Sequence, residues 1–491
     1  GNIGGGGFMV YHGDDGHATT FDFREKAPLA ATERMYLSLD GNVVDNSNHI
    51  GPLAVGVPGT VAGLWKAHQE LGSLPWADLV APAVKLAREG ISINYSLYTG
   101  FARSKPRFDQ YPSSAAKFFK ADGSLYEMGE TWRQPDLAHT LELIQNNGAD
   151  GFYKGENAER LAGFMADIGG IITEEDLLKY ESQEREPIRG TYRGYDIVSM
   201  PPPSSGGVVL VEMLNILEGF DLADMGHNSA DYLHVLTETM RRAYADRAEH
   251  LGDPDFNEGM PLQRLMAKDY AATLRASIDM DEASESRPAD FAQIYESEET
   301  THFSIVDKEG NMVSMTYTLE FGYGSGIVVE GGGYLLNNEM GDFNAVPGVT
   351  TSRGLIGTAP NLVEPEKRPL SSMTPTIVAK DGKPIFTAGS PGGKTIINTT
   401  MQVIVNVIDH EMNIAQSVEA GRIHHQWLPD VTSIEAGSLS LDTVRLYEEK
   451  GHRVTERGGQ GAAMAVYHDR ENGLFEGAAD SRRGDGAAVG Y

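Results

Sequence analysis

A pattern typical of a β-hairpin begins at Thr300 and limits the folds that this chain can adopt. Polar and apolar residues alternate on both sides of the turn sequence "DKEGN", which is typical of two antiparallel strands. If Asp307 and Asn311 flank a three-residue turn, Thr300 lies opposite Thr318. Side chains opposite each other across a hairpin point to the same face and come into contact. The sequence therefore predicts that two threonine hydroxyls meet where the first strand begins.

An acidic segment leads into this hairpin. Residues 279–299 hold eight acidic residues against one basic residue, which predicts a solvated, mobile stretch. A threonine hydroxyl needs a base to become a good nucleophile, and one such base is the residue's own α-amine. A cut between Glu299 and Thr300 would free that amine at a place where little structure is lost. Thr300 is therefore a candidate N-terminal nucleophile supported by Thr318. The alternative is a threonine pair that only stabilises the hairpin.

Strands are expected at both ends of the chain, with a mostly helical region from about 58 to 280 between them. The later segments alternate strands and helices, and the last two segments are again strand-like. Sheets covered by helices follow from this order, as an α/β or α+β sandwich. The expected strands are 8–12, 18–25, 302–307, 312–319, 326–336, 374–379 and 384–388, and the later helices are about 395–410 and 414–421.

Composition narrows the possible partners. The chain has 491 residues, of which 40 are basic and 70 acidic, and its formal net charge is −30. Such a surface repels nucleic acid and anionic membranes, so neither is expected as a partner. The absence of cysteine excludes disulfides, thiolate metal sites and a cysteine nucleophile. No run of 18 apolar residues occurs, so no membrane span is expected. The abrupt start "GNIGGGGFMV" leads us to expect an upstream segment.

A glycine loop offers a second site for chemistry. "IFTAGSPGGKTIINTT" (385–400) is typical of a strand, a loop and a helix. Its Gly-Lys-Thr suggests a phosphate-binding P-loop and a nucleotide hydrolase, but Ala388 stands where that motif needs glycine. Gly392 and Gly393 let backbone N–H groups converge on an anionic oxygen at a helix start. That oxygen could be a phosphate or the oxyanion of an acyl-transfer intermediate.

Arg24 is a candidate carboxylate-binding residue. It alternates with apolar neighbours in "FDFREKAP", so we expect its side chain on the polar face of a strand. A guanidinium binds a carboxylate through two hydrogen bonds. The alternative is an ordinary ion pair with Asp22 or Glu25.

Further polar candidates lie in two loops. Ser371 and Ser372 could donate hydrogen bonds to a carboxylate, or could simply form a turn. Glu339 and Asp342 in "LLNNEMGDF" suit an ammonium group, and the alternative is a solvated turn.

The adjacent pair His424 and His425 offers no clear metal site. In a strand or helix the two side chains face apart, so we interpret both residues as structural. No metal site and no cofactor are expected.

Taken together, these motifs resemble the gamma-glutamyltranspeptidase (glutathione hydrolase) family over essentially the whole chain. The resemblance implies an N-terminal nucleophile hydrolase with an α+β, four-layer αββα sandwich. It also implies a precursor that cuts itself between Glu299 and Thr300 into a large subunit, 1–299, and a small catalytic subunit, 300–491, which form a heterodimer. The motifs are "GGGGFMV", "DFRE", "GVPGTVAG", "MPPPSSGG", "TTHFSIVD", "LLNNEMGDF", "KRPLSSMTPT", "GSPGGKTI" and "HHQWLPD".

The resemblance implies a role for each candidate residue and a periplasmic or extracellular location. Thr300 resembles the nucleophile, Thr318 its supporting threonine, and Gly392 with Gly393 the oxyanion hole. The donor's α-carboxylate would be held by Arg24, Ser371 and Ser372, and its α-amino group by Glu339 and Asp342.

One departure concerns the donor pocket. Glu320 stands where well-studied family members have asparagine, and Arg353 stands near the position of a lid tyrosine found in some bacterial members. We expect Glu320 and Arg353 to form an ion pair that closes the pocket, and the carboxylate to favour hydrolysis over transfer to an amine. Relatives that hydrolyse poly-gamma-glutamate or acylated β-lactams share the nucleophile, so those donors remain alternatives.

Overall fold

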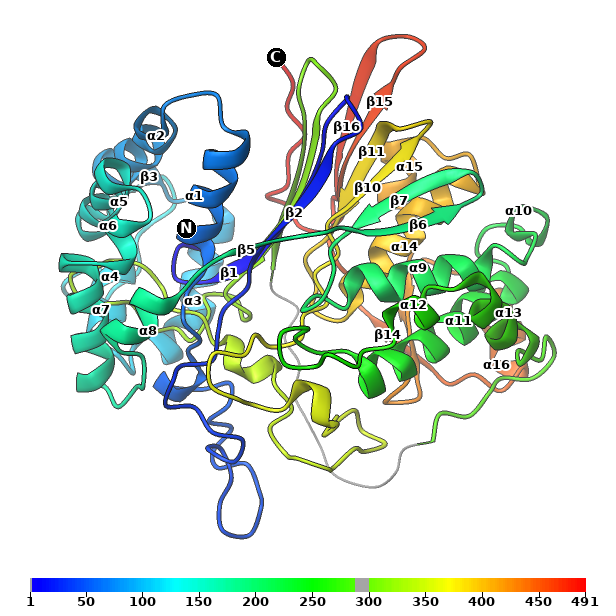
Figure 1. Cartoon of the computed structure of the whole chain (residues 1–491), viewed down its shortest axis with the longest axis horizontal. Coiled ribbons are helices and arrows are strands. Elements are labelled where there is room, and N and C mark those ends of the chain that lie inside the picture. Colours follow the sequence, from blue (N-terminus) through cyan, green and yellow to red (C-terminus); the bar gives the residue numbers. More distant parts are fainter. Residues whose placement is uncertain (1, 288–299) are drawn as a thin grey trace.

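Two β-sheets face each other in the computed structural model, and helices cover their outer faces (Figure 1). The structure describes residues 2–287 and 300–491. Helices α1 to α8 lie on the left of Figure 1, and helices α9 to α16 lie on the right. The four-layer αββα sandwich of the α+β class is confirmed.

The first sheet has five antiparallel strands and carries the hairpin. Thr301 pairs with Tyr317, which places Thr300 opposite Thr318 as predicted. This hairpin does not stand alone, because β1 pairs along the other edge of β9. In spatial order the strands are β5 (Gln183–Arg185), β2 (Ala18–Phe23), β1 (Gly6–His12), β9 (Met312–Thr318) and β8 (Thr301–Val306).

The second sheet has six strands, all antiparallel to their neighbours. Its inner face packs on β1, where Phe8 and Val10 contact Val198 and Ile377 in a buried apolar layer. In spatial order the strands are β16 (Leu474–Ala479), β15 (Met464–Asp469), β11 (Lys383–Gly389), β10 (Thr376–Lys380), β7 (Tyr195–Ser199) and β6 (Ile188–Tyr192).

The helices on the left of Figure 1 cover the first sheet. Helix α1 packs on β1 and β2, α2 packs on α5, and α5 to α8 pack on one another in succession. The elements are α1 (Thr60–Leu71), α2 (Trp76–Glu89), β3 (Ile91–Ser92), α3 (Tyr95–Phe108), α4 (Pro112–Phe118), β4 (Thr131–Trp132), α5 (Pro135–Asn147), α6 (Asp150–Tyr153), α7 (Glu156–Asp167) and α8 (Glu174–Lys179).

The helices on the right cover the second sheet around the largest apolar core. Every residue of α9 is buried. Ser229 caps the start of α11, because its hydroxyl accepts the N–H of Tyr232. The elements are α9 (Gly206–Leu217), α10 (Leu222–Met225), α11 (Ala230–His250), α12 (Leu262–Leu265), α13 (Lys268–Ala276), α14 (Thr395–Ile408), α15 (Ile414–Glu419) and α16 (Leu441–Glu449), with a small sheet of β12 (Ile423–His424), β13 (Thr432–Glu435) and β14 (Val454–Arg457).

The prediction of a strand at 326–336 is wrong. This segment forms turns, with a single bridge between Val328 and Leu335. Gly331 and Gly333 adopt positive φ values of 67° and 68°, which bend the chain back before a strand can extend. In the first turn of α4, Ser113 donates to the carbonyl of Val328, and the hydroxyl of Ser114 accepts the N–H of Val328. Side chains therefore bond backbone groups that a neighbouring strand would otherwise pair.

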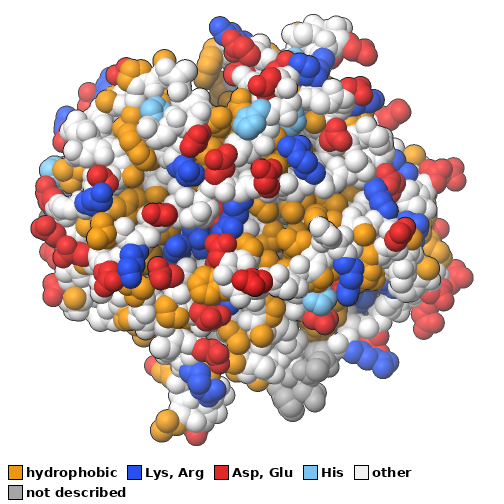
Figure 2. All heavy atoms as spheres, in the orientation of Figure 1, with side chains coloured by type: hydrophobic (Ala, Val, Ile, Leu, Met, Phe, Trp, Pro, Cys, Tyr) orange, Lys and Arg blue, Asp and Glu red, His pale blue; other side chains and the backbone are white. Residues whose placement is uncertain are grey.

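The described part of the acidic segment lies against the body of the protein. Ser284 N–H donates to Glu238 at 3.0 Å, and Ser286 N–H donates to Asp430 at 3.0 Å. Residues 288–299, including Glu299, lie outside the described residues. On the face shown in Figure 2, acidic side chains are scattered and do not form one patch. Among the described helices, none is long and apolar enough to cross a membrane.

Candidate active site

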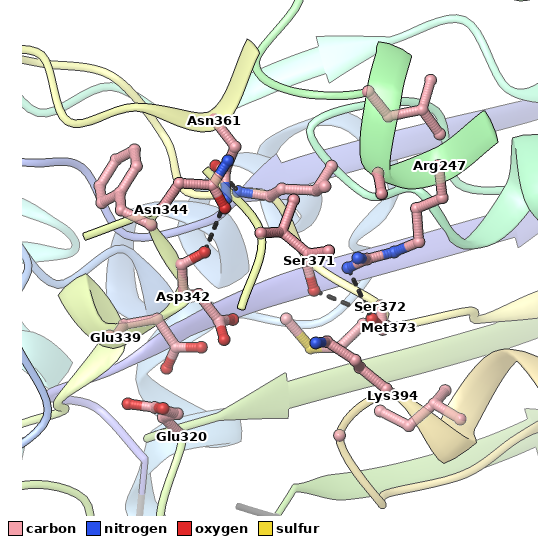
Figure 3. Close-up of a pocket in the computed structure, with 18 of the residues that line it drawn as sticks. Arg247, Glu320, Glu339, Asp342, Asn344, Asn361, Ser371, Ser372, Met373 and Lys394 are labelled. Carbon is pink, nitrogen blue, oxygen red and sulfur yellow. Dashed lines mark hydrogen bonds between the residues drawn. The ribbon is translucent and has the colours of Figure 1, made fainter. Parts of the chain in front are cut away.

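A cavity of about 120 Å³ lies where β8 and β9 meet the loops that follow the second sheet. Most of the predicted site residues line it although they are far apart in sequence. Arg24 and Gly392 are the two exceptions, since neither belongs to the lining. The lining includes Thr300, Thr318, Glu320, Glu339, Asp342, Ser371, Ser372 and Gly393. Figure 3 shows acidic side chains along one side and serines, Arg247 and Lys394 along the other.

The two threonines sit at the ends of paired strands. Thr300 directly precedes β8 and is half-buried, and its carbonyl accepts a hydrogen bond from Arg483 at 3.4 Å. Thr318 is the last residue of β9, and its hydroxyl accepts the N–H of Glu320 at 2.8 Å. The backbone of a sheet is rigid, so the hairpin fixes both hydroxyl-bearing residues at one cavity wall.

The glycine loop joins β11 to α14 beside these threonines. Gly392 has φ 134° and Gly393 has φ 54°, which side chains with a Cβ rarely adopt. A Cβ on Gly392 would lie 2.4 Å from the hydroxyl of Thr395. Within the described part of the chain, the N–H groups of Gly392 and Gly393 donate to no acceptor. Two free N–H groups at a helix start are suited to an anionic oxygen.

Arg24 lies in the acidic wall, and its Nε donates to the carbonyl of Pro369, two residues before Ser371, at 3.2 Å. Its side chain is fully buried, which corrects the expectation of an exposed polar face. The guanidinium forms short ion pairs with Glu339 and Asp342 and lies 3.5 Å from Glu25. Burial raises the pKa of Glu25 to about 7, against the opposing effect of Arg24. Burial also holds the pKa of the Glu339 carboxyl well above its usual range, although Arg24 opposes this shift.

Glu320 does not pair with Arg353. The strand ends at Thr318, and Glu320 turns into the left-handed region with φ 72°. Its carboxylate meets His49 Nδ1 at 2.9 Å, whereas Arg353 is exposed and shares no ion pair with it among the described residues. Burial, followed by the charge of Asp342, raises the pKa of Glu320 well above its usual range. The expected Glu320–Arg353 ion pair is therefore wrong.

Two carboxylate oxygens in the lining of the cavity have no partner among the residues that the structure describes. Oε2 of Glu320 and Oε2 of Glu339 are buried and accept no hydrogen bond in the described structure. Buried acceptors are normally satisfied, and leaving one unpaired costs about 1–3 kcal/mol. Two such oxygens in one cavity indicate a site built for a cation or an ammonium group.

The opposite wall presents hydroxyl groups. The oxygen of Ser371 accepts the N–H of Met373 at 3.1 Å, and the oxygen of Ser372 accepts from Arg247 at 2.9 Å. Since each oxygen already accepts, each hydroxyl proton is available to a ligand. Two hydroxyl protons beside a guanidinium suit a carboxylate.

His424 and His425 have structural roles, as expected. His424 Nδ1 hydrogen-bonds the amide of Asn398 at 2.7 Å, and His425 Nε2 lies 3.2 Å from Asp430. Burial lowers the pKa of His424 to about 3. In the part of the chain that the structure describes, no group of three or more His, Asp or Glu side chains could hold a metal ion.

The sequence interpretation missed His49, Arg247 and Lys394, all of which line the cavity. Arg247 had a usable signal, because it continues the buried face of α11 at helical spacing from Met240 and Tyr244. A charged residue on an apolar helix face needs a partner or a ligand. His49 lies in a loop with no periodicity, so its neighbours could not be inferred from spacing.

The family model described as gamma-glutamyltranspeptidase matches residues 1–490. The chain belongs to this family. It is 46% identical over 495 residues to a glutathione hydrolase proenzyme of Escherichia coli (strain K12), covering 100% of this chain and 84% of that protein. It is 39% identical to a glutathione hydrolase proenzyme of Bacillus subtilis (strain 168), covering 99% and 84%. The comparison does not support the nucleotide-hydrolase alternative, because the gamma-glutamyltranspeptidase model covers the glycine loop as well.

Solved structures confirm the architecture. A cephalosporin acylase from Bacillus halodurans superposes with a TM-score of 0.86 at 26% identity, covering 100% of this chain and 87% of that one. A Helicobacter pylori gamma-glutamyltranspeptidase chain gives a TM-score of 0.57 at 44% identity, covering 58% and 81%.

Proposed function

We propose that this member of the gamma-glutamyltranspeptidase family is a self-processing γ-glutamyl hydrolase and transferase that cleaves glutathione or related γ-glutamyl compounds through an acyl-Thr300 intermediate. The observation that carries the proposal is the two-sided cavity beside Thr300, with unpaired oxygens of Glu320 and Glu339 facing the hydroxyls of Ser371 and Ser372. An amino acid carries an ammonium and a carboxylate on one carbon, and these two walls are complementary to that pair. The names of the relatives in Escherichia coli and Bacillus subtilis support the same activity.

The chemistry follows from the cut before Thr300. The freed α-amine of Thr300 takes the proton of its own hydroxyl, and Oγ attacks the γ-carbonyl carbon of the donor. The N–H groups of Gly392 and Gly393 stabilise the oxyanion, and Thr318 keeps the nucleophile in place. The C–N bond breaks, the protonated α-amine returns the proton to the leaving amine, and an ester on Thr300 remains. Water or an acceptor amine then attacks the ester, which releases glutamate or a new γ-glutamyl amide.

The donor's orientation follows from the charges of the walls. Its α-ammonium group lies against Glu339 and Asp342, and Oε2 of Glu320 accepts a further N–H. Its α-carboxylate lies against Ser371 and Ser372. The resemblance assigns Arg24 to that carboxylate as well, and in this structure its guanidinium pairs with Glu339 and Asp342 while its Nε donates to the carbonyl of Pro369.

A second cavity of about 800 Å³ adjoins the first at Thr300 and Thr318. It is open and leaves room for the leaving group or for an acceptor. Water reaches the ester freely through such a space, so we propose that hydrolysis is favoured over transfer. Glu320 contributes to this choice, because its buried carboxyl replaces an amide beside the donor amine.

The hydrolytic preference can be measured as the ratio of transpeptidation to hydrolysis with a chromogenic γ-glutamyl donor and glycylglycine. Glu320→Asn should raise this ratio. An unchanged ratio removes Glu320 from the choice between water and amine.

The two parts of the chain, 1–299 and 300–491, are proposed to remain together as a heterodimer after the cut. Each contributes strands to both sheets, so neither half can complete the sandwich without the other. The relatives named as proenzymes support a precursor. We also propose a periplasmic or extracellular location, which follows from the family alone.

An acylase activity on poly-gamma-glutamate or acylated β-lactams is the second candidate, supported by the cephalosporin acylase structure and by an acylase ACY 1 proenzyme of Pseudomonas sp. (strain SE83) at 35% identity. The unpaired oxygens of Glu320 and Glu339 favour an ammonium-bearing donor instead. The test is to incubate the protein with glutathione and separately with a glutaryl β-lactam. Release of glutamate from glutathione supports the proposal, and cleavage of the β-lactam amide alone would overturn it.

A further inference from the structure

Arg247 is a buried arginine at the wall of the donor cavity. It lies in the last turn of α11, and its side chain reaches the cavity beside Ser372 (Figure 3). Nε donates to the hydroxyl of Ser205 at 2.8 Å, and a terminal nitrogen donates to the hydroxyl of Ser372 at 2.9 Å. Both partners are neutral oxygens.

Within residues 2–287 and 300–491, no carboxylate neutralises this guanidinium. Among the described residues, no Asp or Glu lies within ion-pair distance of Arg247, whereas Arg24 has Glu25, Glu339 and Asp342. A buried charge without a counter-ion is costly. The C-terminal end of α11 offsets part of that cost, since the helix dipole favours a cation there. The part of the positive charge of Arg247 that stays unneutralised is suited to an anionic ligand.

The contact with Ser372 also sets the direction of a hydrogen bond. Because the serine oxygen accepts from Arg247, its proton is directed away from the guanidinium and toward another acceptor. Arg247 holds Ser205 as well, whose hydroxyl donates to the carbonyl of Ser371 at 2.7 Å. One side chain therefore fixes both ends of the serine segment that faces the cavity.

We infer that Arg247 is a positioning residue of the α-carboxylate subsite: it orients Ser372 as a donor and adds positive charge to the wall that the serines form. The inference deepens the proposed function and rests on it. The subsite selects acyl donors that carry a free carboxylate at the α-carbon.

The charged groups that face Arg247 are consistent with this role. Lys394 lines the same cavity, and burial together with the charge of Arg247 lowers the pKa of Lys394 to about 7. Burial also lowers the pKa of Arg247, while Tyr244 and the more distant Asp342 oppose the shift. An arginine stays protonated throughout the neutral range, so above pH 7 Arg247 is the lasting positive charge of this wall.

The test uses three p-nitroanilides that differ only at the α-carbon of the acyl group. The γ-L-glutamyl compound has both charged groups, the glutaryl compound lacks the amine, and the 4-aminobutanoyl compound lacks the carboxylate. Arg247→Met and Arg247→Lys are compared with Arg242→Met, a change on the same helix outside the cavity lining. Each protein is first checked for the cut at Thr300 and for its Tm.

Arg247→Met should raise KM and lower kcat/KM at least about tenfold for the γ-glutamyl and glutaryl donors, since a charge-assisted contact is lost. It should change the 4-aminobutanoyl donor less than about twofold. Arg247→Lys should lie between wild type and Arg247→Met, because it retains the charge without the forked donor geometry. Arg242→Met should leave the ratio between the three donors unchanged.

An equal loss for all three donors would overturn the inference, because a structural role does not distinguish a carboxylate. If a donor is cleaved too slowly, inhibition constants replace rates: that of L-glutamate should rise about tenfold in Arg247→Lys or Arg247→Met, and that of 4-aminobutanoate should not. Equal changes in both constants would again overturn it. Failure of the proposed function is distinguishable, since wild type itself would then leave the γ-glutamyl donor intact.

Discussion

The two arginines near the donor cavity are bound in opposite ways. Arg24 is surrounded by Glu25, Glu339 and Asp342, while the described partners of Arg247 are two serine hydroxyls. Both side chains are buried. The same residue type therefore neutralises charge in one wall and leaves charge available in the other.

This difference separates structural from ligand-directed charge. In the acidic wall, four carboxyl groups outnumber one guanidinium, those of Glu25, Glu320, Glu339 and Asp342. The surplus faces the cavity as the unpaired Oε2 atoms of Glu320 and Glu339. In the opposite wall the surplus charge is positive, because the described partners of Arg247 are neutral hydroxyls. A zwitterionic amino-acid head group would compensate both surpluses at once, whereas a ligand with one charge would leave a wall unsatisfied.

We expect the largest effect from removing the hydroxyl of Thr300, the candidate nucleophile beside both walls of the cavity. Thr300→Ala should lower γ-glutamyl hydrolysis at least about a thousandfold, because no other hydroxyl is poised with a free α-amine. The measurement is the initial rate with a chromogenic donor. Thr300→Ser is the matched control and should retain part of the activity. Full activity in Thr300→Ala would show that another residue is the nucleophile.

The comparison of the arginines predicts a large effect on stability at Arg24. Arg24→Ala leaves buried carboxyl groups without their cation and should lower the free energy of unfolding by about 3–5 kcal/mol. Chemical denaturation of the Thr300→Ala precursor with and without this change gives the number. Arg247→Met in the same background is the control and should cost less, since only neutral partners are lost. If the order were reversed, the assignment of the two arginines would be wrong.

The hydroxyl wall should show a smaller, binding-specific effect. Ser371→Ala or Ser372→Ala should raise KM for a γ-glutamyl donor about 5- to 20-fold, which corresponds to one lost hydrogen bond to a charged group. The value of kcat should change little. Steady-state kinetics check this, with Ser438→Ala as a control outside the cavity lining. A change in kcat at constant KM would place these serines at the reacting carbonyl instead.

The sequence predicted features that depend on residues close together in the chain better than features that depend on distant residues. The hairpin register was correct because alternation and a short turn are local properties, so Thr300 and Thr318 were placed together. The glycines and serines were found because their motifs are contiguous. The convergence of most of these segments on one cavity followed from the family resemblance and not from spacing.

Other features depended on tertiary contacts that spacing does not encode. Arg24 looks like an exposed strand residue until Glu339 and Asp342, more than 300 residues away, surround it. Glu320 lies two residues beyond the end of β9, where the chain turns, and its partner is His49 and not Arg353. The segment 326–336 is apolar enough for a strand, but its glycines and the helix side chains around it make turns more favourable.

The smallest expected effect concerns pH and the acidic wall. Burial raises the pKa of Glu320 in the folded protein, so the folded state binds its proton more tightly than the unfolded state. Its contribution to stability is therefore present at low pH and is lost as pH rises above the ordinary glutamate range. Glu320→Gln removes this ionisation, and the fall in Tm between pH 5 and 8 should shrink by a few degrees. A fall in Tm identical to that of wild type would mean that Glu320 is already ionised in the fold.

The most direct test of the account is the identity of the chain's pieces. Wild-type protein, purified and denatured, should separate into fragments of 299 and 192 residues, and N-terminal sequencing of the smaller should begin at Thr300. After brief exposure to a γ-glutamyl donor, mass spectrometry should find the γ-glutamyl group on that same terminal residue. A single uncut chain that still cleaves the donor, or an acyl group on any other residue, would contradict the account.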